Sequence, residues 1–206
     1  HELRTPLAGP KTQAQIAMAT EDPAVRQGAL QRIVLSVDRT TRLVRQLLAL
    51  TKLDAGGPPP TPETVPVGLV FDAITDNAHG AGPQVSVAID PALRDLTIRA
   101  SREVLTLALR NLHENAVQHS PVGGKIIWRA TASGLGIAIE DEGPGIPEDE
   151  MALVTQRFFR GRHKSTLGTG LGLAIADAAA RRMGASLRLS NRLDRSGLRA
   201  EIELGA

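Results

Sequence analysis

Cysteine and tyrosine are absent from this chain of 206 residues, and only 2% of its residues are aromatic. Without cysteine there are no disulfides, no thiolate metal sites and no cysteine nucleophile, which fits a reducing compartment. Few aromatic rings are available for stacking single-stranded bases, and a net charge of +2 gives no reason to expect nucleic acid. No apolar run reaches the length of a membrane span, and no signal peptide is recognisable. Because the chain begins within a helical pattern and without methionine, we expect a fragment of a longer protein.

The first part of the chain predicts a pair of helices. Residues 1–20 form a helical pattern that we expect to be interrupted at Pro6 and at Gly9-Pro10, because proline inside a helix removes a backbone hydrogen bond. Asp22 is the predicted N-cap of the second helix, since Pro23 follows it at the first helical position.

The second helix should run to about Leu53, and it carries an apolar seam along one side. Steps of three and four residues connect the members of this seam: Leu30, Ile33/Val34, Val37, Thr41, Val44, Leu47/Leu48 and Thr51. Two helices in a hairpin cannot bury such a stripe fully, whereas a dimeric four-helix bundle would. We therefore predict a homodimer formed through the N-terminal hairpin. The alternative is that the seam packs onto the rest of the same chain.

Residues 56–62 are rich in glycine and proline and form the one clear domain boundary. Beyond them the pattern predicts strands at about 63–67, 84–89, 96–100, 124–132, 135–141, 186–191 and 198–204, and helices at 68–79, 101–119, 148–154 and 170–183. The last strand alternates apolar and charged residues, which implies one covered and one solvent-facing sheet face. The predicted class is α+β: a helical hairpin, then an α/β sandwich whose mixed sheet is covered by helices on one face.

Two glycine-rich stretches in the second part predict a nucleotide site. The strand that ends at Asp141 alternates, so this carboxylate should point in the same direction as the core residues of its strand. In Asp141-Glu-Gly-Pro-Gly-Ile-Pro147, Gly143 and Gly145 lack the Cβ atoms that would keep a flat ligand from the backbone. Gly168-Thr-Gly-Leu-Gly172 opens a helix whose free N–H groups suit phosphate. Together the two stretches predict a purine nucleotide bound at both ends.

Familiar phosphate motifs do not account for this site. Gly168-Thr-Gly-Leu-Gly172 lacks the G-x-G-x-x-G spacing directly after a strand that dinucleotide binding requires. Gly161-Arg-His-Lys-Ser165 resembles a P-loop, but His163 stands where a glycine should precede the lysine. The nucleotide would therefore be bound in another way.

The predicted helix 101–119 carries Asn111, Asn115 and His119 at every fourth position, so the three side chains share one face. Asparagine is a poor residue for a helix interior, and its alignment with histidine calls for a reason. One interpretation is that the amide oxygens hold Mg²⁺, which prefers oxygen ligands and relies on substrate phosphates for the rest. The other is a solvated face with an incidental histidine. Zinc is disfavoured, because the H-E-x-x-H pattern that starts at His113 has valine in place of its second histidine.

Five short motifs occur together in this chain. They are His1-Glu-Leu-Arg-Thr-Pro6, Asn111-Leu-His-Glu-Asn115-Ala, Asp141-x-Gly143-x-Gly145, Arg157-Phe-Phe-Arg160 and Gly168-Thr-Gly-Leu-Gly172. In order and spacing they resemble the H, N, G1, F and G2 boxes of bacterial two-component sensor histidine kinases. The resemblance covers essentially the whole chain. It implies a dimerisation and histidine-phosphotransfer hairpin (1–55), a linker (56–62) and a GHKL-type ATP-binding catalytic domain (63–206).

By this resemblance, His1 would be the phosphoacceptor whose imidazole attacks the γ-phosphate of ATP. Glu2 would orient the ring and take its proton. A neutral imidazole nitrogen is nucleophilic near neutral pH, and a neighbouring carboxylate fixes its tautomer. Thr5 would help water to remove phosphate from the partner regulator.

The same resemblance implies nucleotide-binding roles in the second domain. Asp141 would accept the adenine amino group, and Asn115 with Asn111 would hold a Mg²⁺ ion that bridges the phosphates. The other expected contacts are His119 stacking near the nucleotide, Gly143 and Gly145 beside it, Phe158 as lid anchor, Arg160, Arg162 and Lys164 toward phosphate, and Gly168, Thr169, Gly170, Leu171 and Gly172 as hinge and phosphate cradle. Such positioning and charge neutralisation is most of what phosphoryl transfer requires.

The expected activity is ATP-dependent autophosphorylation on histidine, followed by transfer to an aspartate of a response regulator, with ATP and Mg²⁺ as cofactors. The expected partners are a second copy of the chain and the receiver domain of a cognate regulator. We expect a cytoplasmic fragment of a protein anchored in the bacterial inner membrane. Two alternatives stay open: another ATPase of the same nucleotide-binding fold, and a non-enzymatic dimeric interaction module with a vestigial ATP site.

Overall fold

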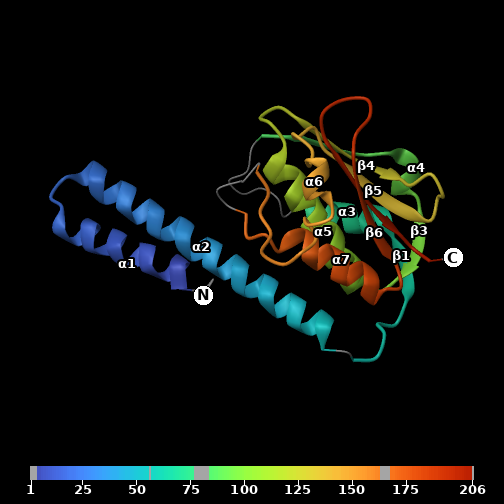
Figure 1. The fold of residues 1–206 in the computed structure, drawn as a ribbon, viewed down its shortest axis with the longest axis horizontal. Helices are drawn as coiled ribbons and strands as arrows, with labels where there is room; N and C mark the ends of the chain where they lie inside the picture. Colours follow the sequence, from blue (N-terminus) through green and yellow to red (C-terminus); the bar gives the residue numbers. More distant parts are fainter. Residues whose placement is uncertain (1–3, 56, 77–83, 163–167, 206) are drawn as a thin grey trace. The chain divides into compact units, whose positions relative to one another are not determined.

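The computed structural model describes residues 4–55, 57–76, 84–162 and 168–205. The chain separates into two compact units, residues 1–51 and 52–206. The first unit holds helix α1 (Arg4–Ala19) and most of helix α2 (Pro23–Asp54), which form a hairpin (Figure 1). Within the described ranges, no helix is long and apolar enough to cross a membrane.

The helix pair confirms one sequence prediction and corrects another. Asp22 Oδ1 accepts hydrogen bonds from the backbone N–H groups of Ala24 (2.8 Å) and Val25 (3.5 Å), so Asp22 is the N-cap of α2. The interruption predicted near Pro6 and Gly9-Pro10 is wrong, because α1 continues through Pro10. A proline in the first helical turn has no hydrogen bond to lose, and a single later proline removes only one.

The apolar seam predicted along α2 is largely exposed in the single chain. Five of its members have between 42% and 59% of their surface exposed: Leu30, Val34, Val37, Val44 and Leu48. An exposed apolar stripe at helical spacing is a surface that another helix can cover.

The second unit is built around a five-stranded mixed sheet with the strand order β2-β4-β5-β7-β6. Its strands are β2 (Ser86–Ile89), β4 (Lys125–Ala130), β5 (Gly136–Glu140), β6 (Ser186–Asn191) and β7 (Leu198–Glu203). β2 and β4 are parallel, and the other neighbours are antiparallel. A separate antiparallel pair joins β1 (Glu63–Pro66) to β3 (Thr97–Ala100), a division into two sheets that the sequence did not predict.

Three helices cover one face of the larger sheet (Figure 1): α3 (Val67–Thr75), α5 (Arg102–His119) and α7 (Gly172–Arg182). Two four-residue helices, α4 (Pro91–Arg94) and α6 (Glu148–Met151), lie in the connections. N-terminal helices followed by a mixed sheet with helices on one face confirm the predicted α+β class.

The core between the helices and the sheet contains Trp128, the only tryptophan of the chain, which is fully buried. Its ring meets Phe71 edge-on, with the ring centroids 5.3 Å apart. On another side lies His113 of α5, with its ring centroid 5.9 Å from that of Trp128. A histidine is therefore part of the hydrophobic core.

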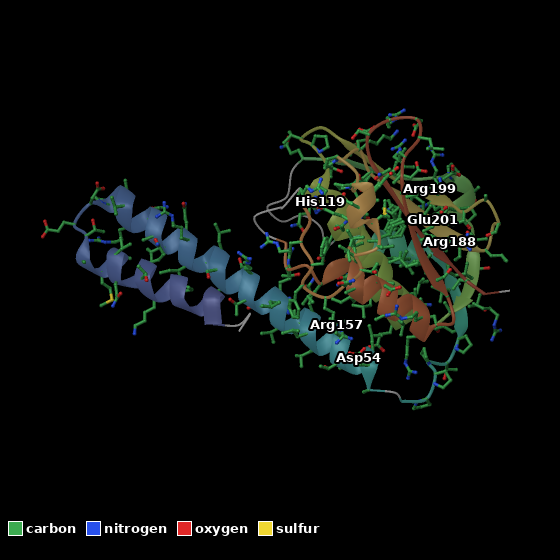
Figure 2. All side chains as sticks on the ribbon, viewed as in Figure 1. Asp54, His119, Arg157, Arg188, Arg199 and Glu201 are labelled. Atoms are coloured by element: carbon green, nitrogen blue, oxygen red, sulfur yellow. The ribbon has the colours of Figure 1, made fainter. Side chains whose placement is uncertain are left out.

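Strand β5 is buried on both faces, although its alternation predicted a half-buried strand. Ala138 and Glu140, on the side away from the helices, are covered by long side chains of the neighbouring strands. Arg129 of β4 and Arg199 of β7 form ion pairs with Glu140 at 3.3 Å and 2.5 Å. Figure 2 shows members of this charged cover on β6 and β7: Arg188, Arg199 and Glu201. Buried carboxylates of this kind are tolerated because they are paired.

Candidate functional site

The carboxylate of Asp141 follows the end of β5 and is only 3% exposed. Its Oδ1 atom accepts hydrogen bonds from the backbone N–H groups of Gly143 (2.8 Å) and Leu198 (3.0 Å). Burial raises the pKa of Asp141, while the two backbone hydrogen bonds and the nearby charges of His119 and Arg192 oppose that rise. The result is a fixed acceptor oxygen in a place sheltered from water.

Two glycines after Asp141 are required by close packing. A Cβ atom on Gly143 would lie 2.8 Å from the backbone oxygen of His119, closer than such atoms come. Gly145 has a positive φ of 74°, and a Cβ atom there would lie 2.6 Å from Oδ1 of Asn191. Both glycines therefore let the loop run close to the end of α5 and to the strand end at Asn191.

The polar stripe on α5 lies as predicted on one helix face. Asn111 is 7% exposed, and its Nδ2 donates to the backbone oxygen of Leu107 at 2.9 Å. That bond leaves the amide oxygen to face the start of α7, where a Cβ atom on Gly172 would lie 3.7 Å from it. Asn115 and His119 follow on the same face and are half-buried. Figure 2 shows His119 at the end of α5.

These donors fit magnesium better than other metals. An amide oxygen beside a helix start supplies the hard oxygen ligand that Mg²⁺ prefers, with phosphate oxygens completing the shell. Within the part of the chain that the structure describes, no group of three or more His, Cys, Asp or Glu side chains could hold a metal by itself.

The start of α7 has no side-chain cap. Leu171 occupies the N-cap position with its side chain fully buried, and it makes no capping hydrogen bond. No acidic residue lies in the first turn. The free backbone N–H groups of the first turn of this helix are therefore directed at the space beside Asn111, together with the positive end of the helix dipole.

The segment before α7 brings two predicted motifs together. The backbone N–H of Phe158 donates to the backbone oxygen of Gly170 at 2.8 Å. Gly170 has a φ of 71°, and a Cβ atom there would lie 2.8 Å from the backbone of Phe158. Phe158 itself has a φ of 65°, which is rare for a residue with a side chain and is typical of functional sites. Thr169 Oγ1 accepts from the N–H of Leu171 at 3.3 Å.

The basic residues that the sequence predicts to contact phosphate differ in what the structure shows of their surroundings. Arg162 is held by the carboxylates of α6: it forms an ion pair with Asp149 and contacts Glu150 at 3.3 Å. Its backbone N–H also donates to Glu150, at 3.2 and 3.3 Å to the two oxygens. Arg160 is exposed. Lys164 lies outside the described residues.

Other predicted positions also lie outside what the structure describes. These are His1 and Glu2, together with the side chain of Thr5. Arg157, the first residue of its predicted motif, forms an ion pair at 2.6 Å with Asp54, and both belong to the second unit (Figure 2).

Sequence reasoning missed the polar residues of the connection between β6 and β7. Asn191, Arg192 and Ser196 all form hydrogen bonds to the loop that follows Asp141. No local pattern pointed to them, because their partners lie about fifty positions away. The sequence also did not single out Glu150, which is 8% exposed and anchors Arg162.

Two family models match the chain. Residues 1–56 match the His Kinase A (phospho-acceptor) domain. Residues 100–205 match the family described as histidine kinase-, DNA gyrase B-, and HSP90-like ATPase, and this match covers just over half of the chain.

Curated relatives match along nearly the whole chain. "Sensor protein QseC" of Escherichia coli (strain K12) is 32% identical over 206 residues, which cover 98% of this chain and 45% of that protein. "Swarming motility regulation sensor protein RssA" of Serratia marcescens is 31% identical over 209 residues, covering 99% of this chain and 44% of that protein. The chain thus spans less than half the length of these relatives.

Solved structures agree with this similarity. The mycobacterial sensor histidine kinase MprB is 29% identical with a TM-score of 0.57, covering 70% of this chain and 97% of that chain. Acinetobacter baumannii histidine kinase AdeS has a TM-score of 0.71 and covers 100% of this chain and 97% of that chain. At 22% identity, this second likeness shows the fold alone.

Proposed function

The chain belongs to the sensor histidine kinases, and from this premise we propose that it transfers the γ-phosphoryl group of ATP to His1 and then to an aspartate of a response regulator. The observation that carries most weight is the pairing of two features at opposite ends of one site. A buried carboxylate whose plane is fixed by two backbone N–H groups suits the amino group of adenine. An uncapped helix start beside an asparagine oxygen suits phosphate.

At the adenine end, Asp141 accepts a hydrogen bond from the exocyclic amino group through Oδ2. The two backbone donors to Oδ1 fix the plane of the carboxylate, so that this acceptor is positioned before the ligand arrives. Gly143 and Gly145, which let the loop pack closely against His119 and Asn191, are proposed to lie beside the base, and His119 is proposed to stack near it. A guanine, which carries a carbonyl where adenine carries the amino group, would place two acceptors against each other.

At the phosphate end, the N–H groups of α7 and the hinge formed by Gly168, Thr169, Gly170, Leu171 and Gly172 hold the phosphates. Asn111 and Asn115 are the proposed ligands of Mg²⁺, which when bound would neutralise charge on the phosphates. Phe158 anchors the lid through its backbone contact with Gly170. Arg160 and Lys164 are the proposed phosphate contacts within the lid. Arg162 is engaged by the carboxylates of α6 and would need to leave them in order to reach phosphate.

The transfer itself forms a bond between an imidazole nitrogen of His1 and the γ-phosphorus. The bond from that phosphorus to the oxygen it shares with the β-phosphate breaks, and ADP leaves. Glu2 takes the ring proton, which keeps the attacking nitrogen nucleophilic. Thr5 is proposed to position water when phosphate is removed from the regulator.

The hairpin also provides the proposed protein contacts. The exposed seam on α2 supports a homodimer in which two hairpins form a four-helix bundle. The same hairpin would dock the receiver domain of a response regulator. We assign residues 1–55 to dimerisation and phosphotransfer, 56–62 to a linker and 63–206 to catalysis. We also propose that the chain is the cytoplasmic part of a longer protein anchored in the bacterial inner membrane; the chain spans less than half the length of relatives that are named sensor proteins.

Incubation with γ-labelled Mg-ATP tests this proposal, with a His1→Gln variant in parallel. Label on the protein that is labile in acid and absent from the variant is the expected result. ATP hydrolysis without labelled protein would instead favour another ATPase of the same fold. Absence of label even when a His1→Gln partner with an intact ATP site is mixed with the chain, together with failure to bind ADP, would favour a non-enzymatic module.

A further inference from the structure

The loop at Asp141–Pro147, called the base loop below, is bound along most of its length by one other segment. That segment consists of the last residue of β6, the turn that follows it and the first residue of β7; these residues, 191–198, are called the hairpin turn below and are drawn in red in Figure 1. The two segments are about fifty residues apart in the chain, and the antiparallel pairing of β5 with β7 brings them together.

Asn191 makes the most specific of these contacts. Its Oδ1 accepts a hydrogen bond from the N–H of Ile146 at 2.8 Å, and its Nδ2 donates to the backbone oxygen of the same residue at 2.7 Å. One amide side chain therefore satisfies both backbone groups of Ile146, as a neighbouring strand would. The positive φ of Gly145 and the absence of a Cβ atom there allow this approach.

Two further side chains of the hairpin turn bind the other end of the base loop. Ser196 Oγ donates to the backbone oxygen of Gly143 at 2.6 Å. Arg192 Nη1 donates to the backbone oxygen of Asp141 at 3.2 Å, and the side chain of Arg192 is only 7% exposed. Asp194 fixes that guanidinium through Nε at 3.1 Å and Nη2 at 2.8 Å. These are charge-assisted, two-point contacts of the kind that hold a side chain in one orientation.

The backbone of the hairpin turn completes the connection. Leu198 N–H donates to the carboxylate of Asp141, and the N–H of Asp141 donates back to the oxygen of Leu198, each at 3.0 Å. Arg195 forms an ion pair with Glu142 at 2.9 Å. The base loop is therefore contacted at Asp141, Glu142, Gly143 and Ile146, all from a single turn.

We propose that the hairpin turn is a clamp that holds the base loop in its nucleotide-binding shape, and that Asn191, Arg192 and Ser196 are positioning residues for adenine nucleotide. Because the clamp residues bond to the loop backbone, they act through the loop. Loosening the loop lowers the fraction of molecules that are ready to bind, and the apparent dissociation constant rises by that factor. This inference rests on the proposed function, since it assumes that the base loop binds ATP.

Four variants test the clamp: Asn191→Ala, Ser196→Ala, Ser196→Thr and Leu193→Ser. Leu193 lies in the same turn with its side chain fully exposed, so its variant is the matched control. Asn191→Ala loses two hydrogen bonds and should weaken ADP binding about tenfold, whereas Ser196→Ala loses one and should weaken it about fivefold. Ser196→Thr keeps the hydroxyl at an exposed position and should stay within about twofold of wild type, as should the control.

Two measurements on the whole chain separate positioning from general destabilisation. The first is the dissociation constant of Mg-ADP by calorimetry. The second is amide hydrogen exchange without nucleotide, in which the N–H of Ile146 should exchange faster in Asn191→Ala while the N–H groups of α5 keep their wild-type rates. Where labelling by ATP is measured, the KM for ATP should rise with little change in the maximal rate.

The outcomes distinguish the two hypotheses. If wild type does not bind Mg-ADP, the proposed function fails, whatever the exchange rates of the variants. If wild type binds but Asn191→Ala and Ser196→Ala bind equally well, the clamp is wrong while the proposed function stands. Faster exchange spread evenly over the second unit, or a Ser196→Thr variant as weak as Ser196→Ala, would also overturn the positioning role.

Discussion

His113 connects the stability of the second unit to pH, because it is a titratable residue placed in the core. Its side chain is 2% exposed, and burial lowers its pKa from 6.5 to about 4. Unfolding returns the imidazole to water, so the unfolded chain binds a proton more tightly than the folded chain does. The folded state is therefore unaffected above about pH 6.5, loses stability as the pH falls from there to about 4, and loses no more below that from this group.

The size of the effect follows from the shift in pKa. A shift from 6.5 to about 4 corresponds to about 3 kcal/mol when the titration is complete. Between about pH 8 and about pH 5 the expected loss is about 2 kcal/mol. This loss is a measurable fraction of the free energy of unfolding of a typical domain, which is about 5–15 kcal/mol. Asp141 acts in the opposite direction, since burial raises its pKa, and it partly offsets the loss at the acid end.

Trp128 supplies the assay, because it is the only tryptophan and its indole Nε1 donates to Nδ1 of His113 at 3.4 Å. Urea unfolding followed by tryptophan fluorescence should give a free energy of unfolding that falls with acidification. His113→Gln offers the indole an amide oxygen and does not titrate, so its stability should lack this dependence between about pH 7 and about pH 5. Equal pH dependence in the two proteins would refute the assignment of the effect to His113.

Three further predictions concern the site. Asp141→Asn removes a charged acceptor and should weaken ADP binding, measured by calorimetry, at least tenfold, or about 1.5–3 kcal/mol. Because burial raises the pKa of Asp141, the affinity of the wild type for ADP should also begin to fall on acidification at a higher pH than an ordinary aspartate would give. Unchanged affinity in either test would contradict the adenine contact. Asn115→Ala should raise the Mg²⁺ concentration needed for tight ADP binding about tenfold while leaving binding in EDTA unchanged; equal losses with and without Mg²⁺ would exclude a metal role. Glu150→Ala removes the acceptor for the backbone N–H of Arg162 and should speed tryptic cleavage after Arg162 several-fold, whereas Asp177→Ala, which loses only an ion pair within α7, should leave that cleavage unchanged.

Features set by local pattern could be predicted from the sequence. The fourfold spacing of Asn111, Asn115 and His119 places them on one face of any α-helix, whatever the fold around it. The N-cap at Asp22 was predictable for the same reason, because its hydrogen bonds reach only two and three residues along the chain. Gly143 and Gly145 could be recognised as positions of close approach, although what approaches them could not.

Features set by pairing between distant segments could not be predicted. The burial of Glu140 depends on arginines from two neighbouring strands. The alternation of residues within one strand does not predict which strands will lie beside it. Asn191 looks like an ordinary strand end until the sheet places it beside Ile146. Pro10 is a different case, because the local rule is correct but the surrounding helix tolerates the loss of one hydrogen bond.

The environment of Asp141 shows why a binding carboxylate requires such distant partners. Burial alone would raise its pKa and favour the protonated form, whose O–H group would present a donor where the amino group of adenine needs an acceptor. The N–H groups of Gly143 and Leu198 and the charge of Arg192 all favour the ionised form, and two of these three groups belong to the hairpin turn. The turn that fixes the shape of the base loop therefore also helps to keep its acceptor charged. Because Arg192 both binds the base loop and favours the ionised form of Asp141, a change at Arg192 should alter nucleotide affinity and its pH dependence together.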